Sequence, residues 1–162
     1  MRALADAAGV NLNAATYHFG TKERLYTETF MRRFRSVTKA RLELLRQAKE
    51  GSGGKPLSVE VIMDCMMRPA LLMVREYPTF PALMARNLFL PPTFMLRVIE
   101  EEVTPGLLPF IKELSKTLAH IPADVLRTRI TCAGGALLMM GSTWSIAAQN
   151  NKRRSLPGSL HS

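Results

Sequence analysis

Residues 4–26 read LADAAGVNLNAATYHFGTKERLY, and this stretch decides the fold of the N-terminal third of the chain. Gly9 interrupts two short apolar segments, and glycine readily adopts the left-handed conformation that ends a helix. Asn11 can cap the second segment, because its side-chain oxygen accepts a hydrogen bond from a free backbone N–H group. Two short helices joined by a glycine-containing turn are typical of a helix-turn-helix, here at 2–8 and 12–19.

The rest of the sequence predicts helices separated by short glycine and proline breaks. Strand signals are scarce, so the expected fold class is all-α. Thr21 and Ser58 are predicted N-caps. Pro69 falls inside one helix and is expected to kink or break it, because proline lacks a backbone N–H. The expected helices span residues 22–49, 58–77, 79–90, 93–103, 105–119 and 123–149.

Charge is distributed unevenly along the chain. The 162 residues include 22 Lys and Arg and 13 Asp and Glu, giving a net charge of +9. Residues 1–55 contribute +6, residues 56–150 are neutral, and residues 151–162 contribute +3. A basic segment indicates a polyanionic partner, with nucleic acid first and an acidic membrane surface second. The plain alternative is a soluble protein that is merely basic.

The N-terminal motif resembles one known family. Its matching residues are Leu4-Ala5, Ala8-Gly9-Val10, Tyr17-His18-Phe19, Lys22 and Leu25. In this pattern the chain resembles the TetR family of bacterial transcriptional repressors. The resemblance implies a ligand-responsive cytoplasmic repressor that binds double-stranded DNA as a homodimer and is released by a small-molecule inducer.

The resemblance also implies the domain organisation. Residues 1–49 are expected to form a partial helix-turn-helix domain with a long connecting helix, and the sequence EGSGGKP at 50–56 reads as a linker. Residues 57–149 would form an α-helical ligand-binding and dimerisation domain. Residues 150–162 are expected to be a disordered basic tail.

The second helix of the motif would be the recognition helix, whose N-terminal residues meet base edges in the major groove. Asn13 can pair with adenine through two hydrogen bonds, and Ala14 and the Thr16 methyl group can contact a thymine methyl. The expected DNA-binding residues are Leu12, Asn13, Ala14, Thr16, Tyr17, His18, Thr21 and Lys22.

Phosphate contacts are expected from the end of this helix and the start of the next. Thr21 and Lys22 lie where free N–H groups and the helix dipole attract phosphate. In the family, the residues matching Tyr17, His18 and Lys22 commonly contact the DNA backbone. Core packing is the alternative for Tyr17 and is favoured for Phe19, whereas an ordinary exposed imidazole is the alternative for His18.

The neutral middle of the chain is rich in flexible apolar side chains, which suit adaptable binding surfaces but are more often plain core. By resemblance, they would enclose an apolar or amphipathic inducer. The expected ligand-binding residues are Met63, Met66, Met67, Met73, Met84, Phe89, Phe94 and Met95. Arg68, Arg75 and Arg86 are candidates for an acidic head group and equally for plain surface. Arg32 to Arg46 are expected to be solubilising, with Arg24 a candidate helper in DNA binding.

Small residues near the C-terminus permit close helix packing, either in a monomer core or, by resemblance, in a four-helix dimer interface. The expected interface residues are Gly134, Gly135, Leu138, Gly141 and Trp144. The family has a further helix before the motif and a second dimer helix at the end, and we expect this chain to lack both. The alternative function is therefore a truncated dimerisation and ligand-binding module without effective DNA binding.

Enzymatic activity is not expected, because the sequence contains no catalytic triad spacing and no phosphate-binding glycine loop after a strand. No cofactor and no metal site are predicted. Cys65 and Cys132 lie in apolar segments without metal-ligand spacing, so both are expected to be buried thiols in a reducing cytoplasm. No apolar run is long enough to predict a membrane-spanning helix.

Overall fold

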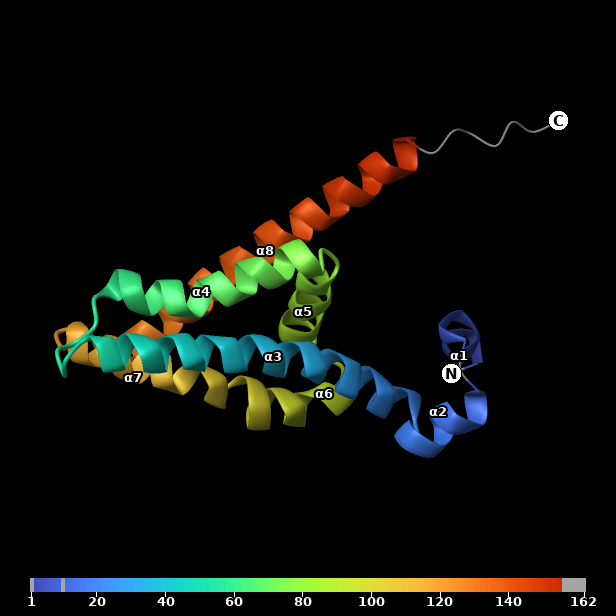
Figure 1. The fold of residues 1–162 in the computed structure, drawn as a ribbon, viewed down its shortest axis with the longest axis horizontal. Helices are drawn as coiled ribbons and strands as arrows, with labels where there is room; N and C mark the ends of the chain where they lie inside the picture. Colours follow the sequence, from blue (N-terminus) through green and yellow to red (C-terminus); the bar gives the residue numbers. More distant parts are fainter. Residues whose placement is uncertain (1, 10, 156–162) are drawn as a thin grey trace. The chain divides into compact units, whose positions relative to one another are not determined.

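The computed structural model describes residues 2–9 and 11–155, and within them it contains helices and no strand, as the sequence predicts. The N-terminal helices are α1 (Arg2–Ala8), α2 (Leu12–Phe19) and α3 (Lys22–Gly51). The later helices are α4 (Val59–Glu76), α5 (Phe80–Phe89), α6 (Thr93–Val98), α7 (Leu108–Thr117) and α8 (Ala123–Ser155) (Figure 1). A π-helical turn (Ile99–Val103) and a 3-10 turn (Pro105–Leu107) connect α6 to α7.

The predicted caps are confirmed by hydrogen bonds. The Asn11 side chain accepts a hydrogen bond from the Asn13 N–H at 2.8 Å, and the Thr21 hydroxyl accepts one from the Arg24 N–H at 3.1 Å. Ser58 does the same for Val61 at 3.3 Å. These bonds satisfy backbone N–H groups that have no partner in the first turn of a helix.

The chain divides into two compact units, Met1–Lys39 and Ala40–Ser162, and this division falls inside α3. Of the predicted linker at 50–56, residues 50 and 51 still belong to α3, and the residues after them turn toward α4. This segment lies within the second unit. The reason is that the second half of α3 carries apolar side chains that belong to the core of the second unit, including the buried Leu45.

The core of the second unit is built by α3, α4, α7 and α8. Phe110 and Ile62 are fully buried, and Leu45 and Ile130 join them from the neighbouring helices. Burial of large apolar side chains is the main source of stability for such a cluster. The other buried members are Leu57, Cys65, Met66, Ile111, Leu114 and Leu126.

Helix α8 differs from the prediction at its end. It continues through Ser155, whereas the sequence reading placed a disordered tail from residue 150. Residues 150–155 contain no glycine or proline that would end the helix earlier. Residues 156–162 of the predicted tail lie outside the described residues.

The two cysteines differ in their exposure to solvent. Cys65 is buried, as expected, and burial raises the pKa of its thiol. Cys132 is exposed, so its predicted burial is wrong. The apolar neighbours of Cys132 in sequence point to other faces of α8, because successive residues of a helix project in different directions.

Close packing of α8 against α5 depends on one glycine. Gly141 is buried, and a Cβ atom placed on it would lie 2.9 Å from the Cβ and Cγ atoms of Pro81. It would also lie 3.4 Å from the Val74 side chain in α4. Contacts of 2.9 Å between carbon atoms are too short, so only glycine permits this approach of the helices.

Glu113 fastens α7 to the end of α3. Its carboxylate is buried and accepts hydrogen bonds from Lys116 Nζ at 3.0 and 3.1 Å, and Lys49 Nζ lies 3.0 Å from Oε1. Burial alone would raise the pKa of Glu113, but the two lysine ammonium groups hold it below its ordinary value. The charge is thereby matched inside the fold.

We predict that Gly141→Ala lowers the free energy of unfolding by about 1–3 kcal/mol, because the added methyl group overpacks the contact with Pro81. Gly51→Ala, at the last residue of α3, is the control outside the helix contacts of Gly141. A Cβ atom at Gly51 meets nothing within 4 Å, so alanine there should not lower the free energy of unfolding. Urea denaturation at one protein concentration measures both. Equal effects of the two substitutions would contradict the packing role of Gly141.

We predict that Glu113→Gln lowers the free energy of unfolding at pH 7 by about 1–3 kcal/mol, because two ammonium groups lose their carboxylate. A depressed folded-state pKa contributes stability above the ordinary carboxyl pKa of 4.5 and loses it as pH falls through the folded value. The difference between wild type and variant should therefore shrink below pH 4.5. Chemical denaturation from pH 7 to pH 3 measures this, and a constant difference would refute it.

Candidate nucleic-acid interface and ligand groove

The turn between α1 and α2 has the geometry that the motif predicts. Gly9 adopts a positive φ of 64°, which side-chain-bearing residues rarely adopt, and its N–H donates to the Asp6 carbonyl at 3.2 Å. Ala5 is buried where α1 packs against α2. A small residue and a sharp turn therefore let the two helices pack closely.

The outer face of α2 is open to solvent. Tyr17 is 87% exposed, and its ring meets the His18 ring edge-to-face with centroids 5.5 Å apart. Core packing is thereby excluded for Tyr17, whereas Phe19 is partly buried. The predicted DNA-binding residues with exposed side chains are Asn13, Ala14, Thr16, Tyr17, His18, Thr21 and Lys22. The Leu12 side chain lies outside the described residues.

A second tight turn joins α2 to α3. Gly20 has a φ of 67°, and its N–H donates to the Thr16 carbonyl at 2.8 Å. Thr21 and Lys22 follow directly, so they lie at the N-terminus of α3, where backbone N–H groups and the helix dipole favour an anion. The first unit therefore presents two neighbouring helix ends with polar, exposed side chains.

The basic residues of α3 fall into two groups. Arg35 pairs with Glu28 at 3.5 Å, and Arg46 makes hydrogen bonds to Glu43 and Glu50 on the exposed surface. These pairs fit the expected solubilising role. Arg41 does not fit the expected solubilising role. Its side chain is mostly buried and donates from Nε to the Met66 carbonyl at 2.6 Å.

The predicted ligand-binding residues have different environments. Met66, Met73, Met84 and Met95 are buried, and Met66 belongs to the core cluster. Two others, Met63 and Met67, are partly buried against that cluster, and Phe89 and Phe94 are exposed.

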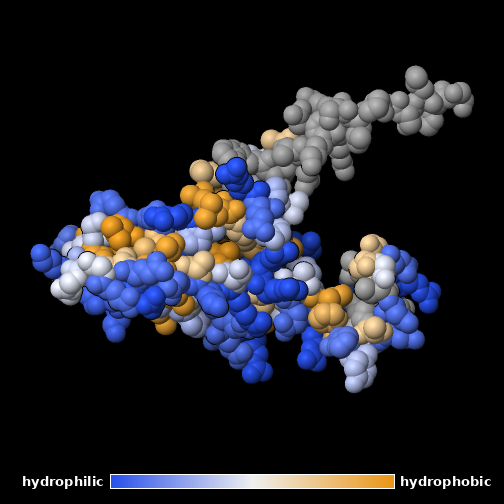
Figure 2. Space-filling view, viewed as in Figure 1, coloured by the Kyte–Doolittle hydropathy of each residue, from blue (hydrophilic) through white to orange (hydrophobic). Residues whose placement is uncertain are grey.

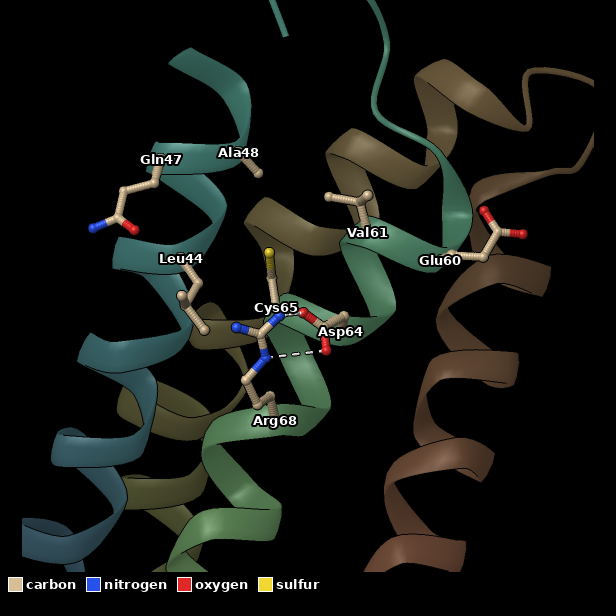
Figure 3. Close-up of a pocket in the computed structure, with 8 residues that line it drawn as sticks. All are labelled: Leu44, Gln47, Ala48, Glu60, Val61, Asp64, Cys65 and Arg68. Carbon is tan, nitrogen blue, oxygen red and sulfur yellow. Dashed lines mark hydrogen bonds and ion pairs between the residues drawn. The ribbon is translucent and has the colours of Figure 1, made fainter. Parts of the chain in front are cut away.

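A groove between α3 and α4 was not predicted from the sequence. It has a volume of about 560 Å³ and is open to solvent. Figure 3 shows Leu44 and Ala48 of α3 directed toward Cys65 and Arg68 of α4. Hydrophobic side chains also lie between hydrophilic ones over this pair of helices in Figure 2. The lining residues are Leu44, Gln47, Ala48, Glu60, Val61, Asp64, Cys65 and Arg68. Of these, Arg68 alone was predicted from the sequence as a ligand candidate, for an acidic head group.

The charged side chains that line the groove form hydrogen bonds with residues of their own helix or its cap. Arg68 donates to Asp64 from Nε at 3.1 Å and also from a terminal nitrogen, and this hydrogen bonding raises the pKa of Arg68. Glu60 points away from the groove (Figure 3). Hydrogen bonds from its own backbone N–H and from Ser58 lower the pKa of Glu60. The floor of the groove is therefore apolar and its rim is polar.

The predicted interface residues on α8 are less exposed than their neighbours. Gly134, Gly135 and Leu138 are partly buried, Gly141 packs within its own chain, and the Trp144 side chain lies outside the described residues. An exposed stripe instead runs along α8 at helical spacing. It contains Cys132, Ala136, Met139, Met140, Thr143 and Ala147.

Among the described residues, no cluster of three or more His, Cys, Asp or Glu side chains has the arrangement of a metal site. The helices of the described ranges also include none that is long and apolar enough to span a membrane.

Comparison with known proteins gives one family. Residues 64–157, more than half of the chain, match the family described as the tetracyclin repressor-like C-terminal domain. No curated protein and no solved structure matches the chain. The match begins in α4 and covers α5 to α8, which carry most of the second unit. The chain therefore belongs to the tetracycline repressor-like family through its C-terminal domain.

Proposed function

We propose that the protein is a ligand-responsive transcriptional repressor. In this proposal the first unit binds operator DNA, the second unit binds a small apolar or amphipathic inducer, and α8 joins two subunits. The observation that carries the proposal is the exposed face of α2, because a side chain as large as Tyr17 is 87% exposed beside polar neighbours in a basic segment. A repressor acts on the chromosome, so we place it in the bacterial cytoplasm and assign it no enzymatic activity.

DNA binding is assigned to α2 and the first turn of α3. Asn13 and Ala14 lie exposed at the start of α2, the part of a recognition helix that meets base edges. Tyr17, His18 and Lys22 are exposed farther along and would contact phosphates. Phosphate contacts supply affinity and base contacts supply sequence preference.

Dimerisation is assigned to α8. Met139 is 70% exposed and Met140 is 57% exposed, and large apolar groups on one stripe of a helix favour a protein partner. A two-fold dimer would present two recognition helices to a palindromic operator. Gly134, Gly135 and Leu138 flank the stripe and would complete the contact.

Inducer binding is assigned to the second unit. Flexible methionine side chains, such as Met63 and Met67, adapt to ligands of irregular shape. The alternative function is a dimerisation and ligand-binding module without effective DNA binding, and it is favoured by the position of the family match, which excludes α1 and α2.

We predict that Lys22→Ala weakens binding to all DNA sequences to a similar degree and reduces the salt slope by about 1, because one phosphate contact is lost. A preferred duplex is first selected from a random pool, and gel-shift titrations are then run at several salt concentrations. Lys112→Ala, an exposed lysine of α7, is the control and should change neither quantity. An unchanged affinity of the Lys22 variant would contradict the phosphate contact.

We predict that Asn13→Ala changes the preferred sequence at one base pair, with a loss of discrimination of about 1–3 kcal/mol. Repeating the selection with this variant measures the change. If the wild-type chain selects no sequence from the pool but still forms dimers, the repressor proposal fails and the alternative module is supported.

We predict that replacing Met139 and Met140 together by glutamate converts dimers to monomers at micromolar concentration, because like charges would meet across the two-fold axis. Sedimentation equilibrium measures the change. Lys112→Glu alters charge on α7 and should leave the dimer intact. A dimer unaffected by the double substitution would place the interface elsewhere.

A further inference from the structure

Arg41 is a mostly buried cation in the second unit. Its Nε atom donates to the Met66 carbonyl in α4 at 2.6 Å, and this is a neutral acceptor. No carboxylate of the described residues lies within ion-pair distance of its guanidinium. A buried guanidinium normally has an anionic partner, because burying an unmatched charge is unfavourable.

The Met66 carbonyl that accepts from Arg41 lies in the same turn of α4 as Pro69. Proline has no N–H, so the carbonyl of the neighbouring Cys65 has no helical hydrogen bond from residue 69. Of the predicted kink or break at Pro69, the break does not occur, because α4 continues from Val59 to Glu76. Arg41 therefore holds the helix at the turn that the proline weakens.

One hydrogen bond leaves most of the guanidinium unused. Arginine has five N–H donors, and only the Nε donor of Arg41 is bonded to Met66. The terminal nitrogens of Arg41 are not among the buried atoms that lack a partner, so they reach solvent. Burial lowers the pKa of Arg41 to about 10, which still leaves the group charged at neutral pH. The guanidinium is therefore a cation without a carboxylate partner among the described residues, and its terminal nitrogens are not fully enclosed.

The open groove ends one helical turn short of this cation, which is not itself one of the lining residues. Helices α3 and α4 run antiparallel because a short turn connects them, so lower residue numbers on α3 face higher numbers on α4. Ala48 and Val61 line one end of the groove, and Leu44 and Arg68 line the other. Arg41 lies one helical turn beyond Leu44, and its acceptor Met66 directly follows the lining residue Cys65.

We propose that this groove binds a small molecule with an apolar body and one carboxylate, and that the guanidinium of Arg41 receives the carboxylate. Leu44, Ala48, Val61 and Cys65 would contact the apolar body. Arg68 is less suited to bind the ligand carboxylate, because its guanidinium already pairs with Asp64. Arginine and carboxylate form paired, charge-assisted hydrogen bonds, which are stronger than bonds between neutral groups.

The inference rests on the proposed function for its role in regulation, since the carboxylate compound would be the inducer. The binding test itself uses no DNA, so its failure leaves the repressor proposal standing. Conversely, a chain that binds the carboxylate but no operator would contradict only the repressor proposal.

The test uses decanoate as the probe and decanol as its uncharged counterpart. Isothermal titration calorimetry of the full chain at pH 7.5, below the micelle concentration, should show saturable binding of decanoate. Decanol should bind about tenfold more weakly, as should decanoate to Arg41→Met, because one charged hydrogen-bonded contact is lost. Arg46→Met is the matched control on α3, where the arginine is exposed and paired with glutamates. Its affinity for decanoate should be unchanged.

Two further variants keep the test decisive if Arg41→Met does not fold. Leu44→Trp fills the groove from a partly exposed position and should abolish decanoate binding without removing the cation. Arg41→Lys keeps the charge and should bind decanoate better than Arg41→Met. The proposal is overturned if decanoate and decanol bind equally, if Arg41→Met binds decanoate as the wild type does, or if Leu44→Trp leaves binding intact.

Discussion

The packing of the second half of α3 against α4 and α7 is the constraint on which the second unit depends. Leu45 enters the core, Lys49 meets the buried Glu113, and Arg41 meets the Met66 carbonyl. One apolar and two polar contacts thus fix both the rotation and the height of this helix segment. An apolar stripe alone tolerates sliding, whereas directional hydrogen bonds do not.

Features of the fold that are local in sequence could be predicted from the sequence. Gly9 does have a positive φ angle, and Asn11, Thr21 and Ser58 do cap helices. Each of these depends on atoms within four residues, so residue type and spacing determine it. The C-terminal end of α8 could not be predicted from the sequence, because a helix without a glycine or proline can continue past its last apolar position.

Features that depend on which helices meet could not be predicted. Gly141 reads as one of several small residues, and only the approach of Pro81 distinguishes it from Gly134. Arg41 reads as one more basic residue of a solvated helix face. Its burial follows from the pairing of α3 with α4, which no spacing in the sequence reveals. The groove was missed for the same reason, since its lining residues come from two helices and are unremarkable on each.

Glu113 and Arg41 show how differently two buried charges can be treated in one small fold. Glu113 is matched by two lysines, so its charge is balanced without any other molecule. Arg41 is held by a neutral carbonyl, and its terminal nitrogens remain accessible. A carbonyl satisfies hydrogen bonding but does not neutralise charge. The arrangement around Glu113 stabilises the fold by itself. Arg41, in contrast, would gain favourable electrostatic energy from an anion. The groove beside Arg41, rather than the surroundings of Glu113, is therefore suited to a charged ligand.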